Sequence, residues 1–310
     1  MSRFLVKRLI LMLATTLVMS MLVFLFLEIS PGNVATKVLG PYSSQEQRQM
    51  WLEANGYFRP LHVRYLGWLG NIVQGDFGES TRFKVPVSEI LWPRLGNTAL
   101  LGAVVMAIVI PLSLTLGMLA GMKEGSLLDR IISVFSIITT SVPEYASAPI
   151  LAAIFVFYLN WLPGTSAMSG GFSWQEMVLP VLVLVLYDFG YVARMTRASM
   201  VEVMTRAYIR TAVLKGLPYR RVIVRHALRN ALIAPFTVIM LQINWLLSGV
   251  IVVEFFFAYK GFGGLLLEAA LNQDWFLIEA CALISVLVVV ISQTIQDLGY
   301  ALLNPRIRFN

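Results

Sequence analysis

Two carboxylates lie within stretches of sequence that are otherwise apolar. Asp188 interrupts the run 177–193, and Glu144 directly follows Pro143 in a long apolar stretch. A charged group is costly in an apolar environment, so both are candidates for binding a cation or lining a translocation pathway. Each also has a simpler interpretation. Asp188 can pair with an arginine near the end of its helix, and Glu144 can lie where a kinked helix admits water.

Groups that support bond-breaking chemistry are sparse. The single cysteine, Cys281, and the two histidines, His62 and His226, are far apart in the sequence, so we expect no metal site. The sequence contains no G-x-x-x-x-G-K-[ST] phosphate loop, so we expect the chain not to hydrolyse ATP by itself. We therefore predict a non-catalytic protein that binds no cofactor of its own.

The composition indicates a lipid environment. Hydrophobic residues make up 58% of the chain and charged residues 13%, with a mean hydropathy of +0.75. Soluble domains contain about 45–50% apolar and about 25% charged residues. This excess of apolar residues is too large for one soluble core, so we predict an all-α, polytopic membrane protein.

Six apolar runs predict six transmembrane helices, because a spanning helix needs about 20 mostly apolar residues. The runs are 9–27, 95–122, 131–175, 177–193, 230–253 and 280–296. The third is irregular, since Pro143, Pro149 and Pro163 can divide it into a helix and a re-entrant piece. The first follows a basic N-terminus, as a secretory signal does. Its 19 residues exceed the about 7–15 of a signal's apolar region, so we expect a retained helix.

The positions of the 24 lysines and arginines predict the topology. With the N-terminus in the cytoplasm, 16 of them fall in cytoplasmic segments and 8 in external ones. Both termini are then cytoplasmic, and the net charge of +7 needs no nucleic-acid partner. The expected parts are the N-terminus with helix 1 (1–27), an external loop (28–97), a core with helices 2–6 (98–303) and a cytoplasmic tail (304–310).

The large external loop, residues 28–97, is expected to contain two helices. Ser44 and Gln47 form a capping-box pair that starts the first, which ends before Pro60. The second covers residues 61–72 and places Tyr65 and Trp68 on one face. This pair can lie at the membrane interface, where Trp and Tyr are enriched, or it can dock an external partner, and the two roles are compatible.

Residues 194–230, here called the basic loop, contain nine basic residues and one acid, Glu202. Each charge costs roughly 2.5–3.5 kcal/mol at the bilayer centre, on the order of 25 kcal/mol in all, so this loop cannot span. A break-free stretch, 201–215, predicts a helix that ends at Gly216, after which Pro218 opens another. Arginines recur every fourth residue in that second helix and can serve to attract lipid headgroups. They are Arg221, Arg225 and Arg229.

Headgroup attraction does not explain the partly apolar turn between these helices, residues 212–218, here called the tip. A small apolar turn on a basic stalk suits a cleft in a soluble partner. Elsewhere, Gln242 and Asn244 in the fifth span are expected to hydrogen-bond between helices. Glu254, at the outer end of that span, is expected to be solvated.

At the basic loop the sequence resembles binding-protein-dependent importer permeases, in the form found in peptide permeases. Residues 208–217, Tyr-Ile-Arg-Thr-Ala-Val-Leu-Lys-Gly-Leu, are similar to their cytoplasmic "EAA" loop, whose glycine falls on Gly216. The motif's glutamate falls on Arg210, and Val213 and Leu214 stand where an arginine and an alanine are usual. The resemblance implies contact with a partner ATPase through eight residues. They are Tyr208, Arg210, Thr211, Ala212, Lys215, Gly216, Leu217 and Pro218.

Further landmarks extend the resemblance over nearly the whole chain, to the B-type subunit of dipeptide and oligopeptide permeases. They are Gly-Asp-Phe-Gly-Glu-Ser at 75–80, Arg-Leu-Gly-Asn-Thr at 94–98, Ser-Val-Pro at 141–143, Trp-Leu-Pro at 161–163, Gly-Phe-Gly at 261–263 and Asn-Pro-Arg-Ile-Arg at 304–308. The family often continues Pro31-Gly32-Asn33 with Asp-Pro, and this chain does not. The implied fold is that of a type I ATP-binding-cassette (ABC) importer permease with cytoplasmic coupling helices.

The resemblance implies a bacterial inner-membrane subunit that imports peptides or similar solutes. Its implied partners are a second homologous permease subunit, two ABC ATPases that bind ATP and Mg²⁺, and an external substrate-binding protein. Related permeases carry nickel chelates, glutathione or oligosaccharide-like solutes, so the substrate stays open. A secondary transporter or channel is the alternative of another class, but we find no clear repeat and only two candidate intramembrane charges. A membrane enzyme lacks a cluster of catalytic groups.

Overall fold

The structure is a computed structural model that describes residues 2–28, 31–40 and 42–303. In these residues the secondary structure is helical apart from one isolated bridge between Glu79 and Pro86. The chain forms two compact units. One combines the first 97 residues with 261–297, and the other combines 98–260 with the stretch from residue 298. The tail at 304–310, with its Asn-Pro-Arg-Ile-Arg landmark, lies outside the described residues.

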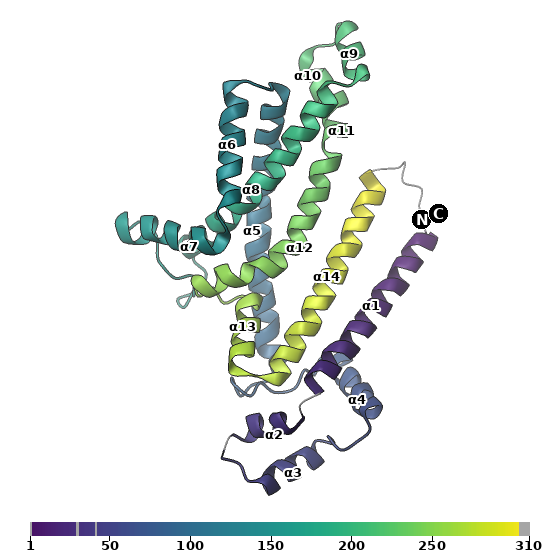
Figure 1. The fold of residues 1–310 in the computed structure, drawn as a ribbon, viewed down its shortest axis with the longest axis vertical. Helices are drawn as coiled ribbons and strands as arrows, with labels where there is room; N and C mark the ends of the chain where they lie inside the picture. The colour runs from purple at the N-terminus through teal and green to yellow at the C-terminus, as the bar shows by residue number, and fades with distance from the viewer. Residues whose placement is uncertain (1, 29–30, 41, 304–310) are drawn as a thin grey trace. The chain divides into compact units, whose positions relative to one another are not determined.

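The first unit is built around two long apolar helices that are drawn side by side in Figure 1. α1 and α14 are joined at one end by an ion pair between Arg8 and Asp297. Short helices and the start of α5 complete the unit. Its helices are α1 (Ser2–Glu28), α2 (Pro31–Leu39), α3 (Gln45–Ala54), α4 (Leu61–Val73), the beginning of α5 (Val87–Met122), α13 (Phe262–Asn272) and most of α14 (Trp275–Leu303).

The core of this unit lies where α5 begins and α13 and α14 meet. Val87 and Leu91 of α5 pack with the apolar faces of the two later helices, and Cys281 is buried among them. In the first loop, the predicted capping box is confirmed, because Ser44 and Gln47 exchange both side-chain-to-backbone bonds at the start of α3. α4 agrees with the predicted second helix within one residue.

The second unit is organised around α8, which packs against α6, α7 and α12. One side of α8 is almost continuously buried, which gives the unit its apolar core. Its other elements are the rest of α5, α6 (Leu127–Ser141), α7 (Glu144–Ala152), the π-helical turn η1 (Ala153–Tyr158), α8 (Trp174–Met204), α9 (Ala207–Leu214), α10 (Tyr219–Arg221), the π-helical turn η2 (Val222–Ala227), α11 (Leu228–Ala231) and α12 (Ile233–Phe256).

The helices agree with a six-span membrane protein. Four are long and apolar enough to cross a bilayer, within α1, α5, α8 and α14. Two bent pairs, 127–158 and 219–243, bring the number to the predicted six when each is one span. The first pair turns by 99° at Val142–Pro143, because the proline cannot continue α6. The predicted division of the third stretch therefore occurs at Pro143.

Candidate functional site

The tip of the basic loop is a helix end closed by glycine. Gly216 follows α9 with φ of +72°, a conformation that L side chains rarely adopt. The Gly216 N–H donates to the Val213 carbonyl over 2.9 Å, and the Leu217 N–H donates to the Ala212 carbonyl over 3.4 Å. This pair of bonds is the Schellman arrangement, which satisfies the last carbonyls of a helix. The predicted stop at Gly216 is confirmed.

Apolar and basic side chains are exposed at the tip, and the side chains on its inner side, here called the base, are buried. Leu214 is 79% exposed and Val213 51%, and Lys215 beside them is also exposed. On the inner side, Ile209 and Ala212 are buried. An exposed leucine next to a lysine, held by a packed helix, is a surface suited to a partner's cleft.

The other predicted contact residues divide into outward and structural ones. Arg210, Thr211 and Pro218 are exposed, and Pro218 caps α10. Tyr208 is 41% exposed, and its hydroxyl accepts a hydrogen bond of 3.1 Å from the Asn230 side chain. That bond joins the start of α9 to the end of α11.

A small apolar core holds the two arms of the basic loop together. Its buried members are Met200, Val203, Ile209, Ala212, Val222, Ile223, Ala227 and Ala231. Half-buried Leu217 packs against it, so this tip residue and Ala212 fasten the tip to its base. On the opposite face Arg221, Arg225 and Arg229 are all exposed, as their spacing predicts.

One prediction in the basic loop is wrong. The stretch 201–215 is not one helix, since α8 ends at Met204 and α9 starts at Ala207. The Thr205 hydroxyl donates to the Glu202 carbonyl over 2.7 Å, and the N–H of Arg206 donates to the Val203 carbonyl over 3.1 Å. A threonine side chain that hydrogen-bonds to nearby backbone competes with the helical hydrogen-bond pattern. Here the Thr205 bond lies at the break between α8 and α9.

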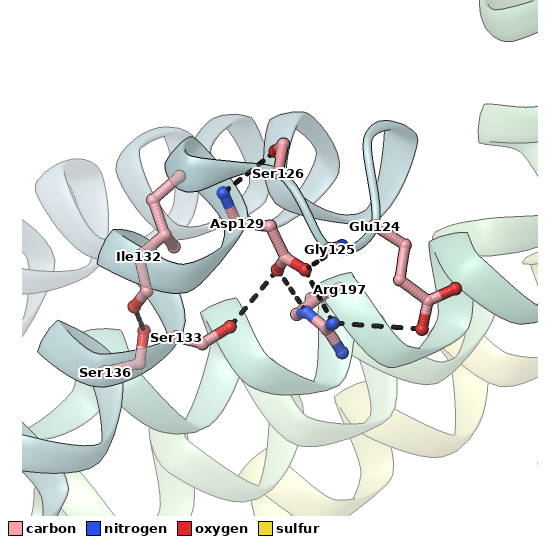
Figure 2. Close-up of polar contacts among 8 residues, drawn as sticks. All are labelled: Glu124, Gly125, Ser126, Asp129, Ile132, Ser133, Ser136 and Arg197. Carbon is pink, nitrogen blue, oxygen red and sulfur yellow. Dashed lines mark hydrogen bonds and ion pairs between the residues drawn. The ribbon is translucent and has the colours of Figure 1, made fainter.

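The basic loop is anchored to α6 by a charged contact (Figure 2). Arg197 of α8 donates from Nε to Oδ1 of Asp129 over 2.5 Å and from Nη2 to Oδ2 over 2.8 Å. The Gly125 N–H and the Ser133 hydroxyl donate to the same carboxylate over 2.9 and 3.2 Å. Asp129 is 2% exposed, so nearly all of its acceptor capacity is used inside the protein. Bidentate arginine–carboxylate contacts are among the strongest polar contacts.

Close helix packing continues this anchor. A Cβ atom on Gly121 of α5 would lie 2.6 Å from Cβ of Met200 and 2.8 Å from the Arg197 carbonyl oxygen. One turn earlier, a Cβ atom on Gly117 would lie 2.6 Å from the Ala193 carbonyl oxygen. A Gly-x-x-x-Gly face of this kind lets two helices approach closely within a membrane. α5 and α6 therefore both hold the end of α8 that leads into the basic loop.

The two predicted intramembrane carboxylates lie close to one another. Asp188 is fully buried in α8, and its Oδ1 accepts a hydrogen bond of 2.6 Å from the Gln242 side chain of α12. Its Oδ2 makes no hydrogen bond to any residue that the structure describes. Glu144, the first residue of α7, is half-buried and near enough to interact electrostatically with Asp188. Beside them, the rings of Tyr187 and Trp245 stack with centroids 4.6 Å apart.

Of the predictions for polar residues in the fifth span, one is confirmed and one is wrong. Gln242 does hydrogen-bond between helices, while the side chain of Asn244 lies outside the described residues. Glu254, expected to be solvated, is fully buried, and the Thr98 hydroxyl donates to it over 2.5 Å. Thr98 belongs to the landmark at 94–98 and supplies the partner that a buried carboxylate needs. Burial and the nearby Glu254 raise the pKa of Tyr259, beyond the end of α12, to about 12.

In the first unit, the landmark at 75–80 has a structural role. The Ser80 hydroxyl donates to Oδ2 of Asp274 over 2.5 Å, and the Arg82 N–H donates to the same oxygen over 3.1 Å. The other Asp274 oxygen accepts from the Leu277 N–H at the start of α14 over 3.4 Å. Ser80 and Asp274 are both fully buried. The landmark therefore fastens the end of the first loop to the first turn of α14.

Sequence reasoning missed the anchor at Asp129. A local signal was present, since Ser126 precedes Asp129 by three residues and caps α6 through its side chain, accepting from the Asp129 N–H over 3.2 Å. The partner Arg197 had no such signal, because it lies in a loop where basic residues are common. Within residues 2–28, 31–40 and 42–303 no group of three or more His, Cys, Asp or Glu residues could hold a metal ion.

Apolar helices long enough to span a bilayer and a basic loop with an exposed tip are features of a polytopic membrane protein. The chain belongs to the family of binding-protein-dependent transport system inner membrane components, which residues 113–309 match. Residues 1–117 match the N-terminal part described for membrane components of the same systems.

Similar proteins align over nearly the full length of both chains. The oligopeptide transport system permease protein AppB of Bacillus subtilis is 34% identical, with 100% of each chain covered. The probable peptide ABC transporter permease protein y4tP of Sinorhizobium fredii is 33% identical, with 99% of each covered. The glutathione transport system permease protein GsiC of Escherichia coli is 33% identical, with 100% of each covered.

Proposed function

We propose that this chain is the membrane subunit of an ABC importer that moves peptides or similar small solutes into the cytoplasm. Support comes from its family and from relatives whose names include oligopeptide, peptide and glutathione transport. The proposed partners are a second homologous permease subunit, two ATPases that carry ATP and Mg²⁺, and an external binding protein. Nickel chelates, glutathione or oligosaccharide-like solutes are alternative cargoes, and the binding protein decides among them.

In this proposal both termini and the basic loop are cytoplasmic, and the first loop is external. Lysine and arginine are enriched in cytoplasmic loops, and residues 194–230 contain nine of them. The orientation is testable by labelling single cysteines. A cysteine at exposed Glu202, which is not among the predicted ATPase contacts, should react in intact cells only after the membrane is permeabilised, whereas one at exposed Glu53 should react directly.

The observation that carries the proposal is the tip, in which exposed Val213, Leu214 and Lys215 stand on a buried base. In the proposed mechanism, ATP binding closes the two ATPases and moves the tip that they hold. The base transmits this motion to α8, which is clamped to α6 by Asp129 and Arg197. The spans then switch from an inward-facing to an outward-facing state, so the chain performs a conformational cycle and no bond chemistry.

The test compares two exposed apolar residues in the assembled transporter. Leu214→Glu places a charge at the tip, and the control Met50→Glu places one on α3 of the first loop, where Met50 is 62% exposed. We expect the tip variant to lose co-purifying ATPase or to hydrolyse ATP without transport, and the control to keep both. Normal coupled transport by Leu214→Glu, or transport in vesicles that lack the ATPases, would refute the proposal.

We further propose that Asp188 and Glu144 lie on the translocation pathway and attract the ammonium group of a peptide. Oδ2 of the buried Asp188 has no hydrogen-bond partner among the described residues, and this supports the role, because such an oxygen is costly unless a ligand or water satisfies it. Asp188→Asn should slow uptake of peptides with a free amino terminus more than uptake of N-acetylated ones. Equal slowing of both would show that Asp188 only supports packing with Gln242.

A further inference from the structure

A charged cavity lies in the first unit, outside the groups assigned above. It has a volume of about 330 Å³ and lies between α4, the end of α1 and the start of α14. Polar and aromatic side chains line it together. They include Tyr57, Arg59, Arg64, Trp68, Phe276 and Glu279. Its volume lies at the small end of the range typical for ligand sites, about 300–1,000 Å³.

Contacts between α1 and α4 form one wall of the cavity. The hydroxyl groups of Ser20 in α1 and Tyr65 in α4 hydrogen-bond over 2.8 Å. The ring of Phe24, which is 5% exposed, lies 5.5 Å from the rings of both Tyr65 and Trp68. These contacts hold α4 against α1, and residues 55–59, between α3 and α4, complete the lining of the cavity.

Basic and acidic side chains both line this space. The side chain of Trp68 hydrogen-bonds to the carboxylate of Glu279. Arg64 lies over the ring of Tyr57, 4.4 Å from its centroid, and donates to the Tyr57 carbonyl over 3.1 Å. The Arg59 side chain folds over Gly56, where an added Cβ atom would lie 3.2 Å from its Nε. Burial, together with Glu279, raises the pKa of Tyr57 to about 12, so its hydroxyl stays a donor at neutral pH.

The cavity is lined by residues near the ends of two apolar runs that are long enough to span a membrane. Phe24 is near the end of the apolar run Arg8–Phe26, and Phe276 and Glu279 are near the start of the run Trp275–Gly299. The ends of spanning helices lie at the membrane–water interface, where Trp and Tyr are also enriched. The headgroup of a membrane lipid can therefore reach this cavity.

We propose that the cavity binds the ethanolamine phosphate headgroup of a phospholipid. Arginine guanidinium groups match phosphate geometry, so Arg59 and Arg64 would hold the phosphate. A primary ammonium can donate hydrogen bonds to Glu279 and lie against the aromatic ring of Trp68. Choline has no N–H donor, and a glycerol headgroup has no cation, so neither offers Glu279 a positively charged hydrogen-bond donor.

The test measures lipid retention on the full transporter by native mass spectrometry. Phosphatidylethanolamine, phosphatidylcholine and phosphatidylglycerol with identical acyl chains are titrated separately. We expect the ethanolamine lipid to bind most tightly, and Glu279→Gln to weaken its binding about tenfold, the size expected for one hydrogen bond to a charged group. Binding of the choline lipid should hardly change, so the variant should lose the preference between the two.

Matched controls separate the cavity from general surface charge. Glu53→Gln removes an exposed acid of α3, and Arg82→Gln removes an exposed arginine, neither of which lines the cavity. Both should retain lipid as the unchanged protein does, whereas Arg59→Gln should weaken binding of all three phospholipids. Equal retention of the three lipids by the unchanged protein, or an unchanged preference in Glu279→Gln, would overturn the proposal.

A last arm distinguishes a lipid from a free solute with the same headgroup. Soluble glycerophosphoethanolamine contains the ethanolamine phosphate group without acyl chains. We expect it to displace the phospholipid only at far higher concentration, because burying acyl chains adds roughly 0.8 kcal/mol per methylene group. Displacement at equal concentrations would show that the cavity binds a soluble ligand and would overturn the assignment to a lipid.

Discussion

The Arg197 guanidinium donates two hydrogen bonds to the Asp129 carboxylate, with nitrogen–oxygen distances of 2.5 and 2.8 Å. Arg197 belongs to α8 and Asp129 to α6, and Arg197 lies in the first part of the basic loop. A contact in this position ties the base of the loop to another helix of the second unit. A force applied at the tip would therefore move α6 with α8 and would not simply bend the end of α8.

We predict that Arg197→Lys weakens this tie, although it preserves the charge. Lysine cannot form the two parallel bonds of a guanidinium, so one carboxylate oxygen loses its charged donor. The expected loss in free energy of unfolding is about 1.5–3 kcal/mol, measured by denaturation of the purified protein in micelles. In the assembled transporter, ATP hydrolysis should continue while transport per ATP falls.

Glu124 offers a matched control for that prediction. Its Oε1 lies 3.9 Å from the same guanidinium, and its side chain is 60% exposed. Exposed ion pairs contribute little, about 0–1 kcal/mol, so Glu124→Gln should leave both stability and coupling nearly unchanged. If Arg197→Lys and Glu124→Gln behaved alike, the bidentate contact would not be the tie that we describe.

Close packing between α5 and α8 leads to a second prediction. Gly121→Ala would force a Cβ atom to 2.6 Å from Met200, so the helices must separate. Overpacking of this kind costs about 1–3 kcal/mol. Gly96→Ala, in the same helix, meets no heavy atom within 4 Å and should be neutral or stabilising by up to about 1 kcal/mol. Thermal unfolding midpoints of the two variants should therefore move apart, and a common direction would argue against this packing.

The landmark at 75–80 gives a third prediction. Ser80→Ala removes one of the three donors to the buried Asp274, which precedes α14, at an expected cost of about 1–3 kcal/mol. Thr81→Ala, at the next and half-buried position, should cost less than about 1 kcal/mol. The measurement is the resistance of the first loop to limited proteolysis, which should fall in the Ser80 variant alone. Similar proteolysis of both variants would contradict the fastening role of Ser80.

Local patterns predicted local structure well. The capping box at Ser44, the stop at Gly216 and the exposed arginines of α10, η2 and α11 all depend on residues within four positions of each other. The sequence also predicted the apolar runs, because bilayer thickness sets the length of a span. The family resemblance, now confirmed, drew on the same local motifs.

The sequence alone did not predict which side chains contact each other across long stretches of the chain. Asp129 and Arg197 are 68 residues apart, and Thr98 and Glu254 are 156 apart. No periodicity pairs such residues, because their contact depends on how whole helices pack. Glu254 was therefore expected in solvent, although it is buried against Thr98. The break before α9 was missed for a different reason, since it coincides with a side-chain bond of Thr205 that proline and glycine rules do not describe.

The last prediction separates the conformation of the tip from its position. Gly216 has φ of +72° with nothing within 4 Å of an added Cβ atom, so Gly216→Ala suffers only the conformational penalty, roughly 1–2 kcal/mol. Gly75 has φ of +84° in equally open space in the first loop, so Gly75→Ala should lose similar stability. Only the Gly216 variant should lower transport per ATP, because the tip alone is proposed to meet the ATPase. Gly216→Asn should restore part of that coupling, since asparagine tolerates positive φ better than alanine. Equal coupling defects at Gly75 and Gly216 would show that general destabilisation, and not the shape of the tip, limits transport.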